Sequence, residues 1–186
     1  MDTRFDERRG QTRARTAVAM SRSDEPIVNR VANSPLKTFD LEALYTEGSR
    51  IALDIAQWFE DGEILRESAF RNALKAADLE GYKGAHVALH CSSDTILPQW
   101  TYSLVTTALA PIAETVIVGD LKQLEVVLYE RALATFDFSI YQDVPVILKG
   151  CSNKPVPDQA YVSAAMALKK VAKKLMYGEA CSAVPL

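Results

Sequence analysis

Short apolar segments alternate with longer amphipathic segments along most of the chain. Apolar runs between turn residues are typical of strands, and apolar residues at every third or fourth position indicate helices. The pattern predicts strands over Arg50–Phe59, Val87–Leu89, Thr115–Val118 and Val144–Leu148, and helices over Glu67–Ala77, Pro98–Ala113, Leu121–Phe136 and Asp158–Met176. This alternation predicts an α/β three-layer sandwich, with a mostly parallel sheet of Rossmann-like winding.

Local signals refine this arrangement. Asp40 is expected to cap a brief helix over Leu41–Leu44, because a side-chain oxygen before a helix accepts its free N–H groups. Arg50–Phe59 alternates apolar and polar residues, which favours a half-buried strand at the sheet edge. One strand order to consider has Val87–Leu89 in the centre, flanked by Thr115–Val118 and Val144–Leu148; if it holds, Cys91 and Cys151 lie on adjacent loops. Right-handed crossovers would then bring the carboxyl ends of all the strands to one edge.

Two zones differ in composition. Residues 1–25 are rich in arginine and lack apolar periodicity, which predicts a disordered tail. The alternative is a basic arm for an anionic partner. Residues 26–186 have the length of a single domain and are predicted to form one α/β domain.

The chain has three cysteines, and a serine follows each of them: Cys91, Cys151 and Cys181. Cys91 and Cys151 come just after predicted strands, so the single-sheet arrangement places them on adjacent loops. Neighbouring strands are about 5 Å apart, which would let two thiolates share one ion. Cys181 lies in the apolar segment YGEACSAVPL, which is expected to dock against the domain and bring the third thiol back.

Three interpretations of these cysteines remain open. The first is a site for zinc, iron or an iron–sulfur cluster. A thiol-dependent enzyme or sulfur carrier, in which one cysteine is the nucleophile, is the second. The third is a non-catalytic interaction module with packed cysteines. Whether the protein is an enzyme therefore stays open.

The fourth metal ligand is left open: Asp94, Asp120 and Glu179 are the alternatives among loop carboxylates, and an open position for water or substrate is another. Asp120 joins the three cysteines in the predicted set, although such residues are more often helix caps or turn formers. His90 is adjacent to Cys91, but consecutive strand residues face opposite sides. His86 lies four residues before His90 and is predicted to be a packed or surface histidine.

Charge and hydropathy exclude some functions. The chain has 21 Lys and Arg residues and 24 Asp and Glu residues, and this balance argues against general nucleic-acid binding. No segment offers the ~20 uninterrupted apolar residues of a membrane helix. The start of the chain lacks the apolar core of a secretory signal, which predicts a cytoplasmic location. Glycine-rich phosphate loops and nucleophile elbows are absent from the sequence.

Several segments resemble domain-of-unknown-function family 2480, an uncharacterised bacterial family. The matching stretches are IVNRVANSPLKTFDLE (27–42), VALHCSSDTILPQWTY (87–102), VIVGDLKQLE (116–125), KGCSNKPVPDQAYV (149–162) and MYGEACSAVPL (176–186). The resemblance implies a connection with iron–sulfur cluster assembly, and hence assembly proteins as partners. It also implies a threonine in relatives at the position of His90, which argues against that histidine as an essential ligand.

Overall fold

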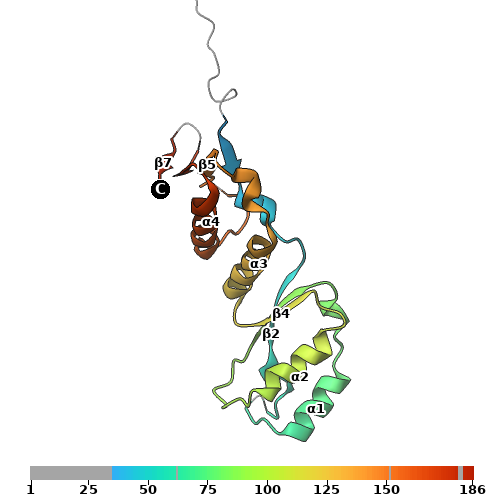
Figure 1. Cartoon of the computed structure of the whole chain (residues 1–186). Helices are drawn as coiled ribbons and strands as arrows, with labels where there is room; N and C mark the ends of the chain where they lie inside the picture. The colour runs from blue at the N-terminus through green and yellow to red at the C-terminus, as the bar shows by residue number, and fades with distance from the viewer. Residues whose placement is uncertain (1–34, 62, 151, 180–181) are drawn as a thin grey trace, which may run out of the picture. The chain divides into compact units, whose positions relative to one another are not determined.

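The computed structural model describes residues 35–61, 63–150, 152–179 and 182–186 (Figure 1). The chain divides into a unit of residues 1–33 and a unit of residues 34–186. The predicted N-terminal tail lies outside the described residues. The strands are β1 (Lys37–Phe39), β2 (Arg50–Asp54), β3 (His86–His90), β4 (Thr115–Val118), β5 (Pro145–Leu148), β6 (Lys174–Tyr177) and β7 (Val184–Pro185). The α-helices are α1 (Glu67–Ala76), α2 (Trp100–Leu109), α3 (Leu121–Thr135) and α4 (Asp158–Val171). The predicted α/β class is confirmed.

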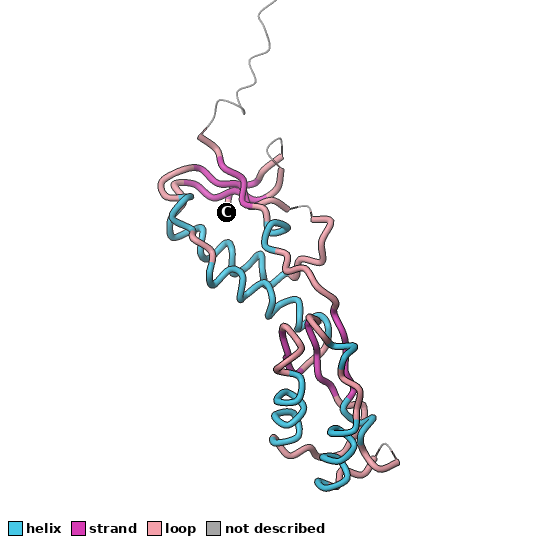
Figure 2. Tube along the Cα trace, turned by 90° about the vertical axis from the view of Figure 1, so that its right-hand side faces the viewer, coloured by secondary structure: helices cyan, strands magenta, loops and turns pink. Residues whose placement is uncertain are grey.

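The strands belong to two sheets, as Figure 2 also shows. One sheet has the order β2-β3-β4 and is entirely parallel. The other has the order β1-β5-β6-β7, in which only the β6-β7 pair is antiparallel. The prediction that β3 is central and β2 an edge strand is confirmed.

The predicted pairing of β3 with β5 is wrong. β3 is flanked by β2 and β4, whereas β5 lies between β1 and β6. The physical reason is that β1 and β6 give β5 its own partners, and neither strand was predicted. Cys91 and the segment with Cys151 therefore follow strands of different sheets and do not lie on adjacent loops.

The predicted final helix is too long. α4 ends at Val171, and the chain then forms β6, which includes Lys174 and Met176. Lys169 and Lys170 lie in the last turn of α4. The sequence signal for the end of α4 is ambiguous, because the apolar residues of β6 continue the helical spacing of α4. A half-buried strand four residues long cannot be told from a helix end by periodicity.

The two faces of the β2-β3-β4 sheet are covered by different helices. On one face, α1 and α2 lie side by side (Figure 1) and enclose a core of buried apolar residues. Phe70 is the centre of an aromatic group in this core, with Trp58, Phe59 and Trp100 around it. On the opposite face, Leu124 and Leu128 of α3 pack against Ala88.

α3 contributes to a second core as well. Its residues Tyr129 and Leu133 are buried with Phe39 of β1, β5 and α4. Helical spacing from Leu124, Leu128 and Leu133 would also place Val127 inward, but Val127 is only half-buried, whereas Tyr129 is buried. A helix with two buried faces has no single apolar stripe, which is why periodicity identified only part of its buried surface.

Candidate functional site

Two of the three Cys-Ser pairs come, in sequence, just after strands that end at the carboxyl edge of the β1-β5-β6-β7 sheet. β5 and β6 are neighbouring parallel strands, with Leu148 opposite Tyr177. The ladder continues past the strands, because the Gly178 N–H donates to the Leu148 carbonyl at 3.0 Å. Cys151 and Cys181 follow in the sequence within four residues of these strand ends. Both cysteines lie outside the described residues.

Gly150 is the last described residue before Cys151 and passes close to β6. A Cβ atom at this position would lie 3.0 Å from Cζ of Tyr177 and 3.1 Å from its hydroxyl oxygen. Tyr177 in turn makes an edge contact with Tyr161 of α4, with ring centroids 6.0 Å apart. A side chain at this position would therefore require the Tyr177 ring to shift by a few tenths of an ångström.

Acidic side chains from the segment after β1 hold the residues around Cys151. Lys149 lies 2.7 Å from Asp40 Oδ2 and 3.5 Å from Glu42 Oε2. Lys154 lies 3.1 Å from Glu47 Oε1 and 4.3 Å from the centre of the Tyr45 ring. Asp40 also caps the short helix Leu41–Leu44, as predicted, by accepting the N–H of Glu42. The Lys149 pKa is raised, chiefly by its hydrogen bond to Asp40.

Glu179 comes two residues before Cys181 in the sequence. Its Oε1 atom is buried and has no hydrogen-bond partner among the described residues. The Ser182 N–H donates to the Glu179 carbonyl at 2.9 Å. A buried carboxylate oxygen without a donor is costly, so such an atom commonly contacts a cation or an ordered water.

The last residues dock as predicted. β7 pairs with β6, with Val184 opposite Tyr177, and the Leu186 N–H donates to the Leu175 carbonyl at 3.1 Å. Lys169 of α4 binds the Leu186 carbonyl at 2.9 Å. The strand that follows Cys181 in the sequence is thus paired with β6.

Cys91 lies at the carboxyl end of the β2-β3-β4 sheet. It is a half-buried free thiol that packs against the core under α1 and α2, and its Sγ donates to the Ser93 carbonyl at 3.5 Å. Tyr102 of α2 is close by, and burial raises the Tyr102 pKa, with smaller contributions from the charges of Cys91 and Asp54. This environment suits a packed cysteine.

The two histidines of β3 have different surroundings. His86 is buried and its Nε2 is 2.9 Å from the Glu47 carbonyl, which confirms the prediction of a packed histidine. His90 lines a cavity of about 630 Å³ with Gly119 and Asp120, beside the start of α3. His90 and Cys91 therefore face opposite sides, as predicted.

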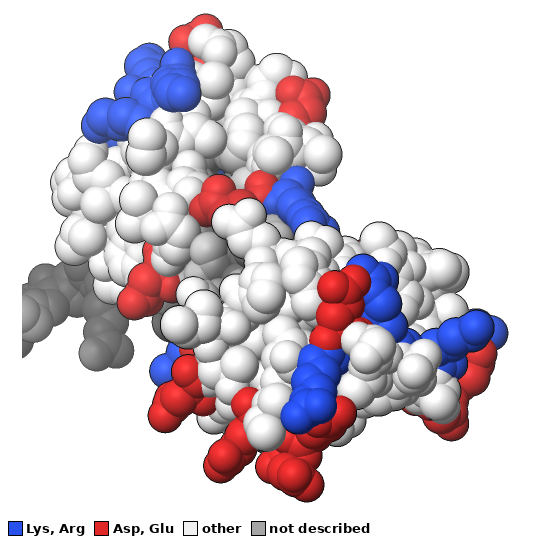
Figure 3. Space-filling model, turned by 90° about the horizontal axis from the view of Figure 1, so that it is seen from below, with Lys and Arg blue, Asp and Glu red and all other residues white. Residues whose placement is uncertain are grey.

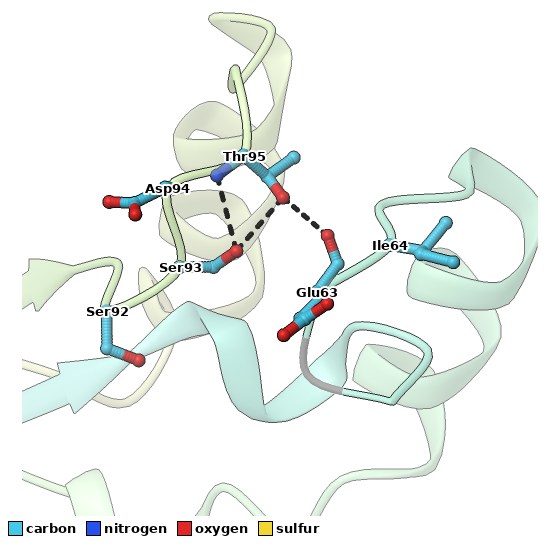
Figure 4. A pocket seen from close by; sticks show the side chains of 6 residues that line it. All are labelled: Glu63, Ile64, Ser92, Ser93, Asp94 and Thr95. Carbon is cyan, nitrogen blue, oxygen red and sulfur yellow. Dashed lines mark hydrogen bonds between the residues drawn. The ribbon is translucent and has the colours of Figure 1, made fainter.

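The loop carboxylates proposed as fourth ligands are engaged differently. Asp120 forms a capping box at the start of α3, in which its Oδ1 accepts the Gln123 N–H at 2.8 Å. Asp94 lines an open cavity of about 590 Å³ with Glu63 and Thr95 (Figure 4). The Thr95 hydroxyl donates to the Glu63 carbonyl, while the Asp94 carboxylate points away from Glu63. Of the three carboxylates, only that of Glu179 has a buried oxygen for which the described ranges supply no hydrogen-bond partner.

Asp54 gives a testable pH dependence. Burial raises its pKa, but hydrogen bonds from Ser92 and Ala56 and the charge of His90 outweigh this, so the pKa lies below the ordinary value. Its contribution to stability is present above the unfolded-state pKa of about 3.9 and is lost as the pH falls through the folded-state value. We expect the NMR titration of the Asp54 carboxyl carbon to have its midpoint below about 3.9. In Asp54→Asn, the free energy of unfolding should fall less steeply as the pH is lowered than it does in the wild-type protein. A titration midpoint of Asp54 at the ordinary value would contradict the prediction.

Charge on the described surface is mixed. Figure 3 shows Asp and Glu side chains next to Lys and Arg side chains, without an extended basic region on that face. Within the described ranges, no helix is both long and apolar enough to cross a membrane. The same residues contain no group of three or more His, Cys, Asp and Glu side chains arranged for a metal ion. The predicted metal set of Cys91, Cys151, Cys181 and Asp120 remains a prediction, because two of its members are not described.

Comparisons with known proteins identify the family. A search of curated proteins and a search of solved structures both find no match. The family model described as protein of unknown function, domain-of-unknown-function family 2480, matches residues 25–186. This range includes both sheets and all three cysteines. The chain therefore belongs to domain-of-unknown-function family 2480, as its sequence motifs indicated.

Proposed function

We propose that the carboxyl edge of the β1-β5-β6-β7 sheet binds a metal ion or an iron–sulfur cluster through Cys151 and Cys181. The observation that carries this proposal is the parallel pairing of β5 with β6, each of which leads within four residues to a Cys-Ser pair. Neighbouring strands are about 4.8 Å apart, and thiolates on adjacent loops at such an edge can share one ion.

Glu179 supports the proposal as a third ligand. Within the described part of the chain its buried Oε1 lacks a hydrogen-bond donor, and a bound cation would compensate the cost of burying it. Two thiolates and one carboxylate form a donor set suited to zinc or ferrous iron. A fourth position would then be open to water or substrate. Cys91 and Asp120 remain predicted ligands, but this form of the site does not require them.

A thiol reaction is the second candidate, because the same strand pairing favours it. One thiolate would attack a disulfide of a substrate, and the second would resolve the mixed disulfide. A sulfur carrier would use one of the same cysteines as its nucleophile. The third alternative, an interaction module with packed cysteines, draws support from the packing of Cys91.

The proposed setting is the cytoplasm, where thiols are kept reduced and available to metals. Iron–sulfur cluster assembly proteins are the proposed partners, on the basis of the family resemblance.

Substitution of the two edge cysteines tests the function. We expect protein purified without oxygen to contain about one zinc or iron atom per chain, or a cluster with broad visible absorbance. Cys151→Ser and Cys181→Ser should each abolish the bound metal, because a two-thiolate site fails when either ligand is lost. Elemental analysis, the visible spectrum and a thiol count give the readout.

Cys91→Ser is the matched control and should leave the metal content unchanged. Loss of metal in this variant would indicate that Cys91 is also a ligand and would support the three-cysteine arrangement. Metal-free protein with a Cys151–Cys181 disulfide after mild oxidation would favour the thiol reaction. Metal-free protein without such a disulfide would leave packing as the role of the cysteines.

A further inference from the structure

β2 is an edge strand, and among the described residues no strand lies on its outer side, because the sheet order is β2-β3-β4. At its start, the His86 N–H donates to the Ser49 carbonyl at 2.8 Å. Backbone groups of successive residues in a strand point to opposite sides, so those of Ile51 and Leu53 face β3. The N–H and carbonyl groups that face outward belong to the other three residues of the strand, Arg50, Ala52 and Asp54.

The middle of this edge is open to solvent. Ala52 is in register with Ala88 of β3, so both side chains are on the face that α3 covers. Ala88 is buried under α3, whereas Ala52 is exposed and lines a cavity of about 630 Å³ beside the first turn of that helix. The structure therefore leaves room for another strand along β2.

β2 also lacks the features that commonly protect a sheet edge. β1 is three residues long and contains Lys37, and β7 is two residues long and contains Pro185. Short length, lysine and proline all disfavour the addition of a further strand. β2 is five residues long and contains neither lysine nor proline. β4, the opposite edge of the same sheet, contains no charged residue that would fix a register.

The sequence of β2, Arg-Ile-Ala-Leu-Asp, is complementary to its own reverse. In an antiparallel pair of two β2 strands centred on Ala52, each Arg50 lies opposite the partner's Asp54. On the other face, each Ile51 lies opposite the partner's Leu53. Opposite charges and apolar side chains are cross-strand pairs that stabilise a sheet, and a twofold axis repeats each pair. Charge complementarity thus favours a second copy of this chain in a single register.

We propose that the protein self-associates through β2, with a twofold axis at Ala52 that joins two copies of the β2-β3-β4 sheet into one continuous sheet. The two Ala52 residues exchange both of their N–H···O=C bonds, and Arg50 does the same with the partner's Asp54. Gln57 already donates to the Asp54 carbonyl at 2.8 Å, but a carbonyl oxygen has two lone pairs and accepts a second donor. Arg50 also binds Glu125 at 2.7 Å, so the partner's Asp54 extends an existing ion pair.

Sedimentation equilibrium of the full chain measures this association. A pair of short strands buries little area, so we expect a weak dimer with a Kd of about 10–100 µM. Ala52→Lys should raise the Kd at least about tenfold, because it places two ammonium groups opposite each other at the axis. Ala52→Thr should leave the Kd within about threefold, since threonine suits a strand and pairs with itself. Ala76→Lys is the matched control, because Ala76 is an exposed alanine on α1, and it should not change the Kd.

Amide hydrogen exchange, measured by NMR at two protein concentrations, locates the interface. Exchange of the outward Ala52 N–H should slow by about threefold between about 20 µM and 1 mM, as the dimer becomes populated. The Ile51 and Leu53 N–H groups face β3 and should exchange at the same rate at both concentrations. Ala52→Lys should abolish the concentration dependence. A reducing agent and EDTA are present throughout, so that neither a disulfide nor a shared metal ion links the copies.

Three outcomes would overturn the proposal. The first is a chain that stays monomeric up to about 500 µM, well above the expected Kd. The second is a dimer in which the concentration-dependent protection falls on Val116 and Val118, the outward residues of β4, and not on Ala52. The third is an equal loss of association in Ala52→Lys and Ala76→Lys, which would indicate a general effect of added charge. None of these results depends on the proposed metal site.

Discussion

Replacing Phe39 with alanine is expected to lower the free energy of unfolding by about 3–5 kcal/mol. Phe39 is 1% exposed, and its ring contacts Phe136, Phe138 and Tyr141 with centroid separations of 5.3, 5.7 and 5.6 Å. The truncation removes buried apolar area and leaves a cavity that rigid neighbouring rings cannot fill. Because Phe39 directly precedes Asp40, the change should also loosen the acidic segment that binds Lys149.

Urea unfolding followed by far-ultraviolet circular dichroism gives this free energy. Val162→Ala is the control, since Val162 is 53% exposed on α4 and should change stability by less than about 0.5 kcal/mol. The fluorescence of Trp58 and Trp100 reports on the other core, under α1 and α2. A fluorescence transition that stays in place while the dichroism transition moves would show that the two cores unfold separately. An effect of Phe39→Ala no larger than that of the control would contradict the prediction.

The second large effect is expected from Arg50→Met, which should cost about 2–4 kcal/mol. Arg50 binds Glu125 of α3 at 2.7 Å, with side chains 12% and 13% exposed. It also donates to the carbonyls of Gly48 and Thr46, both at 2.6 Å. The substitution removes this donor from the Glu125 carboxylate and the Thr46 carbonyl in a partly buried setting. The bond to the Gly48 carbonyl, which is also lost, is exposed.

A double-mutant cycle isolates this pair. Glu125→Leu combined with Arg50→Met should recover part of the loss, because the unpaired carboxylate is then gone. Arg71→Met is the matched control: its partner Glu67 is four residues away on an exposed helix face, so the loss should stay below about 0.5 kcal/mol. Equal losses from Arg50→Met and Arg71→Met would mean that the burial of the first pair has no energetic consequence.

Local features of the fold could be predicted from sequence. The Asp40 cap, the extent of α1 and the edge position of β2 follow from residues within one or two turns of each other. The capping role of Asp120 was likewise the ordinary expectation for an aspartate before a helix. In each case neighbouring residues supply the physical cause, so the sequence is sufficient.

The division into two sheets could not be predicted in this way. Strand pairing depends on partners far apart in the chain, and β1 is three residues long with one buried side chain. Without β1 and β6, the single-sheet arrangement was the simplest one, and it brought Cys91 next to Cys151. For the same reason Glu42 was missed, since nothing local marks a carboxylate that binds Asn153.

The order of strands has a consequence for synthesis on the ribosome. β2, β3 and β4 are consecutive in sequence, so their sheet has all its strands once Val118 has emerged. β1 emerges first but pairs with β5, more than one hundred positions later. It must therefore wait as an unpaired strand while the following sheet and helices form, and such edges are prone to aggregation. Chains that stop before Leu148 keep that edge open, which makes truncated products of this protein a target for chaperones and proteases.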